Sequence, residues 1–205
     1  KGNFDDKINQ KIVNFLKNNK KAKENKIFSL NLEFDQRLIM ILIAKKNDSL
    51  QSEKLGAKFY HYIKTNNINN VLLLGSNFST VKSNIKFNEF IHGVELKAYE
   101  FNLYKTKKPK KEIILNILKR KNLINPKIKY KLDAILNGVN FTKDLVSEPG
   151  NVLHPDEYAR RINSLKKVGL KINIYDEKKL KKLGMNTLLG VGQGSIRGSY
   201  LVTME

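Results

Sequence analysis

The sequence predicts an α/β protein in which short buried strands alternate with amphipathic helices. Three apolar runs of strand length, bounded by polar residues, indicate the strands; they cover residues 38–44, 71–74 and 112–118. Between the first two runs, Leu55, Phe59 and Ile63 recur at helical spacing, which places their side chains on one helix face. A strand, a helix and a strand joined by short links predict a parallel sheet with a right-handed crossover.

Further elements of the first half follow from the same periodicities. Helical spacing of apolar residues predicts an amphipathic helix over residues 4–18 and a long helix over residues 85–104. Residues 27–32 are expected to form a short strand. The helix between the first two buried strands is expected to begin near Ser49 or Ser52, because serine is common at helix starts.

A further helix and the break that follows it mark the expected domain boundary. Asn125 followed by Pro126 is a favourable helix start. The apolar residues beyond it keep one helical face: Ile128, Leu132, Ile135, Val139 and Val146. Pro149 and Gly150 end this helix. We therefore expect an amino-terminal α/β domain, a linking helix with the boundary, and a second α/β segment, which cover residues 1–125, 126–150 and 151–205.

The second segment has its own helix and strand signals. Pro155 opens a helix whose first turn carries two acidic residues, which are favourable beside the positive end of the helix dipole. Residues 170–175 alternate as a strand, and Asp176 is expected to cap a short helix that Gly184 closes. Two more strands are predicted, over residues 187–191 and 200–204.

The composition indicates a globular and strongly basic protein. The 205 residues are 40% hydrophobic, which is enough to fill a core. Lysine and arginine number 39 against 19 acidic residues, so the formal charge is +20 and the chain would attract polyanions such as nucleic acid. Lysine and asparagine are abundant throughout, which fits a general compositional bias at least as well. The absence of cysteine excludes disulfides and thiolate metal sites, and no apolar run approaches the roughly 20 residues that span a bilayer.

One short stretch concentrates the positive charge. Residues 105–111 read KTKKPKK, and Pro109 stops any helix there, so we expect an exposed loop. A solvated loop and a phosphate-contacting loop are both compatible with this composition. In the second interpretation the nucleic-acid contacts would come from this loop and a neighbouring basic run: Lys105, Lys107, Lys108, Lys110, Lys111, Lys119, Arg120 and Lys121.

The residues alone indicate no self-contained active site. The three histidines, His61, His92 and His154, have no spacing that makes a metal site. Adjacent acidic pairs lie at helix starts, where capping and the helix dipole explain them. The one glycine-rich loop, residues 190–198, runs between two predicted strands, so it is interpreted as a tight connection with unusual φ angles rather than a phosphate cradle.

Three segments resemble the leucyl aminopeptidases of peptidase family M17. The first is similar to the pattern G-x-x-L-x-x-Y-x-F-x-x-Y-K, through Gly93, Leu96, Tyr99, Phe101, Tyr104 and Lys105. The second resembles R-D-L-x-N-x-P-x-N-x-x-x-P-x-x-Y-A, through Asp144, Leu145, Pro149, Asn151, Pro155, Tyr158 and Ala159. The third resembles L-G-M-x-x-x-x-x-V-G-x-G-S, through Leu183, Gly184, Met185, Val191, Gly192, Gly194 and Ser195. Departures from these patterns are Lys143 for arginine, Ser147 for asparagine, and His154 for a capping threonine.

This resemblance implies an incomplete enzyme. The family's metal and catalytic motifs, K-G-x-x-x-D-x-G-G and N-T-D-A-E-G-R, do not occur in these 205 residues, so we expect no catalytic and no metal-binding residue in this chain. The implied fold is a macro-like domain, with a mixed or parallel sheet flanked by helices, followed by the first α/β elements of the aminopeptidase catalytic domain. The chain would then be the non-catalytic amino-terminal portion, used for assembly and access to the active site.

For the full-length protein, the resemblance implies a cytoplasmic hexamer that removes amino-terminal residues from peptides. Two divalent ions, Mn or Zn, would polarise the scissile carbonyl and supply a metal-bound hydroxide. The alternative is a basic nucleic-acid-binding module without enzymatic activity. A macro-like domain also raises the possibility of an ADP-ribose binder, which no glycine-rich loop in the first domain supports.

Overall fold

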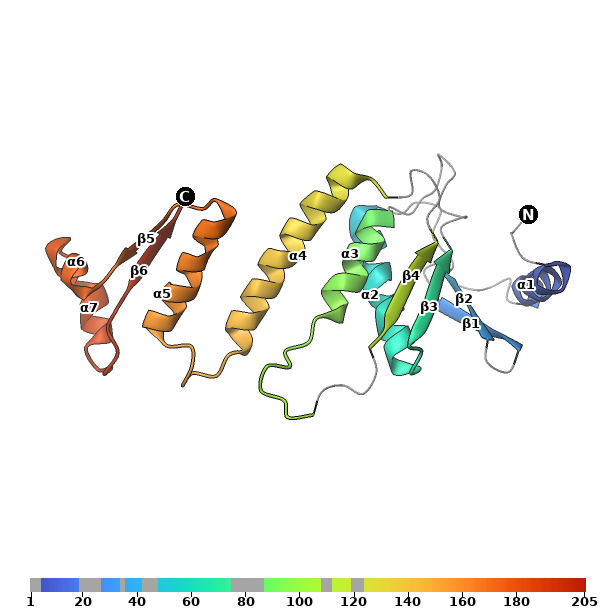
Figure 1. The fold of residues 1–205 in the computed structure, drawn as a ribbon, viewed down its shortest axis with the longest axis horizontal. Coiled ribbons are helices and arrows are strands. Elements are labelled where there is room, and N and C mark those ends of the chain that lie inside the picture. Colours follow the sequence, from blue (N-terminus) through green and yellow to red (C-terminus); the bar gives the residue numbers. More distant parts are fainter. Residues whose placement is uncertain are drawn as a thin grey trace. The chain divides into compact units, whose positions relative to one another are not determined.

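The computed structural model describes residues 5–18, 27–33, 36–41, 48–74, 87–107, 112–118 and 124–205 (Figure 1). These residues form a mixed α/β structure, as the sequence predicts, and the chain divides into two compact units, residues 1–140 and 141–205. The strands of the described ranges pair two by two, as β1 with β2, β3 with β4, and β5 with β6.

The first unit contains a parallel strand pair. Strand β3 (Asn70–Leu74) runs parallel to β4 (Ile114–Leu118), with Asn70 opposite Ile114 and Leu74 opposite Leu118. The parallel pairing expected from the sequence therefore exists, but within the described residues β3 takes β4 as its partner rather than β2 (Gln36–Ile41).

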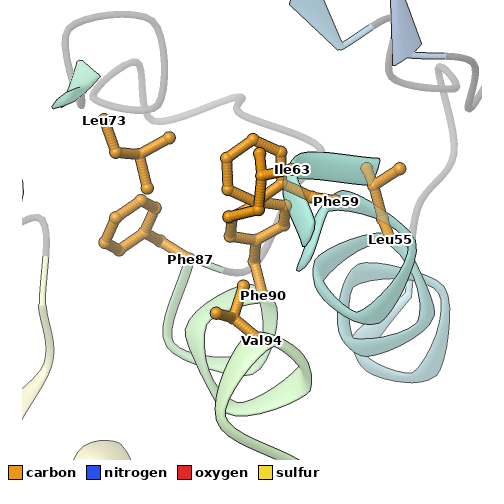
Figure 2. Packing of buried hydrophobic residues seen from close by; sticks show 7 residues of the cluster. All are labelled: Leu55, Phe59, Ile63, Leu73, Phe87, Phe90 and Val94. Atoms are coloured by element: carbon orange, nitrogen blue, oxygen red, sulfur yellow. The ribbon is translucent and has the colours of Figure 1, made fainter. Parts of the chain in front are cut away.

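Two helices supply most of the core of this unit. Asp48 caps helix α2 (Ser49–Thr65): its side chain accepts a hydrogen bond from the backbone of Gln51, and its own backbone N–H donates to Oε1 of Gln51. Helix α3 (Phe87–Ala98) is shorter than the predicted 85–104. The two helices and β3 bury one apolar cluster, shown in Figure 2: Leu55, Phe59, Ile63, Leu73, Phe87, Phe90 and Val94.

Glycine residues let α2 and α3 approach until their backbones touch. A Cβ atom on Gly56 would overlap the carbonyl oxygen of Phe90 and lie 2.9 Å from its carbonyl carbon. A Cβ atom on Gly93 would overlap the carbonyl oxygen of Glu53 in the same way. Each helix therefore contributes one glycine to a contact that no other residue type can make.

The amino-terminal elements form a helix and a hairpin. Helix α1 (Asp6–Asn18) has no buried residue. Strand β1 (Ile27–Glu33) pairs antiparallel with β2, with Ile27 opposite Ile41. Phe15 of α1 meets Phe28 of β1 edge to face, with ring centroids 5.4 Å apart. Aromatic pairs of this geometry are favourable, so the hairpin holds the carboxyl-terminal part of α1.

Helix α4 (Pro126–Ser147) begins where the sequence predicts. Asn125 accepts hydrogen bonds from the backbone of Lys127 and Ile128, which makes it the expected cap. Asn88 of α3 holds the backbone of Asn125 by two further bonds, of 2.8 and 3.3 Å. Of the 22 residues of α4, all of them described, only Leu145 is buried.

The second unit combines helices with an antiparallel strand pair. Helix α5 (Pro155–Asn163) continues into a 3₁₀ turn, η2 (Ser164–Val168), and Gly169 ends it at φ 95°. Strand β5 (Ile172–Tyr175) pairs antiparallel with β6 (Leu201–Met204). Between them, Asp176 caps helix α6 (Glu177–Lys182) by accepting from the backbone of Lys179, and Gly184 follows it at φ 73°, both as predicted.

One predicted strand of this unit is wrong. Residues 187–191 lie in helix α7 (Asn186–Gly192). The glycine-rich segment of residues 190–198 therefore begins in the last residues of a helix and does not connect two strands. Its glycines also lack the unusual φ angles expected of them, since the positive values among the described glycines are those of Gly169 and Gly184.

Candidate functional site

The structure describes two of the eight residues predicted to contact nucleic acid. Lys105 and Lys107 lie in the segment after α3, and both are exposed. The other six, Lys108, Lys110, Lys111, Lys119, Arg120 and Lys121, lie outside the described residues. The structure thus shows two accessible lysines at this place and leaves the remainder of the predicted surface as a prediction.

Local contacts fix the backbone beside these lysines. Phe101 and Tyr104 pack with ring centroids 5.8 Å apart, and the Tyr104 side chain remains exposed. Glu100 forms an ion pair with Lys64 of α2 and accepts a hydrogen bond of 3.2 Å from Asn102. These two hydrogen bonds hold the pKa of Glu100 below its ordinary value. The carboxylate of Glu100 is therefore engaged mainly by Lys64 and Asn102, and the charge of Lys105 lowers its pKa further.

A small cavity lies in the first unit, between α3, β4 and the start of α4. Its volume is about 110 Å³. The lining is half apolar and half polar: Ile91, Ile117, Ile124 and Leu132, with Asn88, Glu95, Lys129 and Asp133.

Each polar side chain of this cavity has a partner in the protein. Lys129 Nζ lies 2.7 Å from Asp133 Oδ1 and 3.8 Å from Glu95 Oε1, and Asn88 is bonded to the backbone of Asn125. Burial raises the pKa of the Glu95 carboxyl above its ordinary value, against the opposing charge of Lys129. The arrangement contains no nucleophile beside a base, so its chemistry is that of a structural contact between α3 and α4.

The histidines occupy three different environments. His61 of α2 is exposed, whereas His92 of α3 is buried, with Nδ1 lacking a hydrogen-bond partner within the described ranges. His154 precedes α5 and makes no side-chain cap, as expected where it replaces threonine; its Nδ1 contacts Asp156 instead. The ranges described by the structure contain no group of three or more His, Cys, Asp or Glu residues able to hold a metal ion.

The second unit contains a cluster of charged side chains that the sequence did not predict. Arg161 of α5 donates to Glu148 Oε1 at 2.7 Å and to Glu157 Oε1 at 2.8 Å. The Glu148 side chain is only 1% exposed, in the break between α4 and α5. Arg160 adds two bonds of 2.6 Å to Glu157. Bonds from Arg160 and Arg161 lower the pKa of Glu157 to about 2.

This cluster joins the residues around Pro149 to α5. Glu148 belongs to the break and Arg161 to the last turn of α5, so their bond ties two parts of the unit that are 13 residues apart. The i,i+4 spacing of Glu157 and Arg161 is a readable sequence signal. The Glu148 contact has no such local pattern and emerges only from the fold.

Residues 140–205, which contain this cluster, match the sequence model of the cytosol aminopeptidase family, catalytic domain. A probable cytosol aminopeptidase of Phytoplasma mali (strain AT) is 42% identical over 129 residues, which are 60% of this chain and 26% of that protein. The corresponding protein of Caulobacter vibrioides is 36% identical over 159 residues, 75% of this chain and 31% of the relative. That of Nitrobacter winogradskyi is 34% identical over 181 residues, 82% of this chain and 35% of the relative.

Two solved structures show a similar fold. A tomato leucine aminopeptidase mutant superposes with a TM-score of 0.72 at 18% identity, over 97% of this chain and 42% of that one. The bottromycin maturation enzyme BotP in complex with Mn gives a TM-score of 0.69 at 16% identity, over 93% of this chain and 41% of that one. The chain is thus similar to the M17 cytosol aminopeptidases in sequence and in fold. It spans about a quarter to a third of the length of the curated relatives named above.

Proposed function

We propose that this chain is the amino-terminal portion of a leucyl aminopeptidase of family M17, an enzyme that removes amino-terminal residues from peptides. The observation that carries the proposal is the extent of the similarity. The match to the Nitrobacter winogradskyi protein covers 82% of the chain, more than residues 1–140 alone could provide, so it includes residues of both units. The family model independently covers residues 140–205.

In this proposal the chain serves assembly and access rather than chemistry. Residues 1–125 would form the macro-like amino-terminal domain, residues 126–150 the link, and residues 151–205 the start of the catalytic domain. The described residues do not fit a two-metal centre, since they contain no group of three or more suitable ligands. We propose that the Mn or Zn ions of the whole enzyme are held by the family's metal-binding motifs, which do not occur in these 205 residues.

The location and assembly of the whole enzyme belong to the same proposal. The described helices include none that is long and apolar enough to cross a membrane. The relatives are named cytosol aminopeptidases, and we place the whole enzyme in the cytoplasm as a hexamer that acts on peptides.

The proposal is tested on the native gene product, purified from its source cells. The match covers 82% of this chain and 35% of the Nitrobacter winogradskyi relative, which is therefore roughly 500 residues long. We expect an intact mass roughly 2.5 times the 23.6 kDa of this chain. We also expect release of leucine from leucine amide that a chelator abolishes and Mn or Zn restores. A product of the expected mass that releases no amino acid under any metal condition would refute the proposed activity.

A second candidate function, nucleic-acid binding, is favoured by the distribution of charge. Residues 1–140 contain 28 basic and 12 acidic residues, so they account for +16 of the net +20. Exposed Lys105 and Lys107 belong to this unit. The proposed surface consists of these two and the other six basic residues of 105–111 and 119–121.

Salt-dependent binding to duplex DNA tests this second candidate. If Lys105 and Lys107 each contact a phosphate, replacing both with alanine lowers the slope of log affinity against log salt by about 1.8. The matched control replaces Lys166 and Lys167 of the second unit, which are also exposed. Equal slopes for the two double variants would show that Lys105 and Lys107 are not phosphate contacts. Discrimination between DNA sequences at physiological salt would distinguish specific from general binding.

A further inference from the structure

Helix α4 presents an apolar stripe that the first unit leaves partly open to solvent. Ile128, Leu132, Ile135 and Val139 follow one another at steps of four, three and four residues, which is the spacing of a helix-packing seam. Ile128 is 39% and Ile135 is 44% exposed, while Leu132 and Val139 are half-buried. We call these four residues the α4 stripe.

The cavity described above adjoins this stripe through Leu132, which belongs to both. The apolar wall of the cavity contains three isoleucines of α3, β4 and the segment before α4: Ile91, Ile117 and Ile124. Its polar groups already have partners in the protein, as in the Lys129 and Asp133 pair, so they favour no polar ligand. An engineered apolar cavity of about 150 Å³ accepts benzene. A cavity of about 110 Å³ is therefore suited to one aliphatic side chain.

We propose that the α4 stripe and this cavity form the docking surface for the remaining part of the same protein's catalytic domain. This inference rests on the proposed function. The named relatives have about two thirds or more of their length outside the match, since the matched residues are 26 to 35% of each relative. Residues 140–205, which match the catalytic-domain model, begin inside α4 itself. Covalent continuity gives that domain a high effective concentration at the stripe.

The charges beside the stripe disfavour a second copy of α4 as the occupant. Lys127 and Lys131 lie four residues apart along one flank, because helical residues at this spacing share a face. Two copies packed through their stripes would bring these lysines to the same seam, where like charges repel. A catalytic-domain surface that is apolar and carries an acidic group opposite Lys131 would complement this flank better than a second copy of α4.

Cysteine labelling of the whole gene product tests the inference. The 205 residues contain no cysteine, so Ile135→Cys introduces a single thiol into this region. Labelling of the unsubstituted protein corrects for any thiol elsewhere in the gene product. The matched control is Asn137→Cys, which lies two residues away on the opposite, exposed side of α4. We expect a maleimide to label Ile135→Cys at least ten-fold more slowly than Asn137→Cys in the native product. The two rates should be equal in denaturant.

The outcomes separate this inference from the proposed function. Equal native rates in a product that hydrolyses leucine amide would overturn the docking surface and leave the aminopeptidase proposal intact. Slow labelling of Ile135→Cys in a product without that activity would support the docking surface while the proposed activity fails. Protection that disappears when the product is diluted to monomers would assign the stripe to a second copy, which overturns the occupant proposed above.

Discussion

Helices α2, α3 and α4 all carry apolar residues at helical spacing, but they differ in how many residues they bury. Helix α3 has 12 residues and buries six of them, whereas α4 has 22 residues and buries one. The difference lies in the partner: α2 and α3 face each other through Gly56 and Gly93, at backbone contact. Apolar spacing therefore predicts that a helix exists, while burial depends on a complementary surface.

The largest loss of stability is expected from a substitution in the core between α2 and α3. Phe90 is fully buried and packs against Phe59, with ring centroids 5.6 Å apart. Phe90→Ala should lower the free energy of unfolding by about 3–5 kcal/mol, because it removes a buried aromatic and leaves a cavity. Chemical denaturation of the 205-residue chain measures the change. Ile135→Ala on α4 is the control and should stay within about 0.5 kcal/mol.

Replacing a glycine with alanine should change the stability of the chain in opposite directions in the two regions. Gly93→Ala forces a Cβ against the backbone of Glu53 and should destabilise the chain by about 1–3 kcal/mol or more. Gly138→Ala on α4 meets nothing within 4 Å and should stabilise it by about 0.5–1 kcal/mol, because alanine restricts the unfolded chain. The same denaturation experiment compares both variants. Destabilisation by Gly138→Ala would show that α4 is packed on that side.

A loss of similar size is expected where the second unit relies on charge. Arg161→Ala removes the ion-pair partner of the buried Glu148 carboxylate, and hydrogen bonds to charged groups contribute about 1.5–3 kcal/mol. Arg160→Ala is the matched control, because that side chain is 72% exposed and bonds to Glu157. Its replacement should have the smaller effect, because ion pairs between exposed side chains contribute little to stability. Equal thermal shifts for the two variants would contradict a special role of the Glu148 contact.

The smallest effect is a pH dependence of the same cluster. The pKa of Glu157 is lowered from 4.5 to about 2 by its two arginines. A carboxyl with a depressed folded pKa contributes stability above its unfolded pKa, and loses it as the pH falls through its folded pKa. This contribution should therefore disappear between about pH 4.5 and 2. Carbon NMR of the Glu157 carboxyl measures the titration, and a midpoint near 4.5 would show that the arginine bonds do not persist in solution.

The sequence alone predicted those structural features that have a local cause. The cap of α4 by Asn125, the cap of α6 by Asp176 and the left-handed Gly184 were all predicted, since each depends on a few adjacent residues. Residues 187–191 were predicted wrongly as a strand. Five residues, TLLGV, are too few to distinguish a period of two from a period of 3.6.

Contacts between distant residues were beyond sequence reasoning. Within the described ranges β3 pairs with β4 and not with β2, and this choice depends on which strands the folded chain brings together. The Arg161 and Glu148 bond likewise depends on the turn at Pro149. For the basic surface, composition identified exposed Lys105 and Lys107, but a run of lysines carries no information about the geometry of a phosphate contact.

The separation of β3 and β4 in the sequence determines how long β3 lacks its partner strand during synthesis on the ribosome. Asn70 pairs with Ile114, so β3 leaves the ribosome 44 residues before its partner strand. At about 5–20 residues per second, the wait is roughly 2–9 s. During that interval the edge of β3 that will receive β4 is accessible to other strands, and such edges are prone to mispairing. Chaperone occupancy on the nascent chain should therefore be greatest between the synthesis of these two strands.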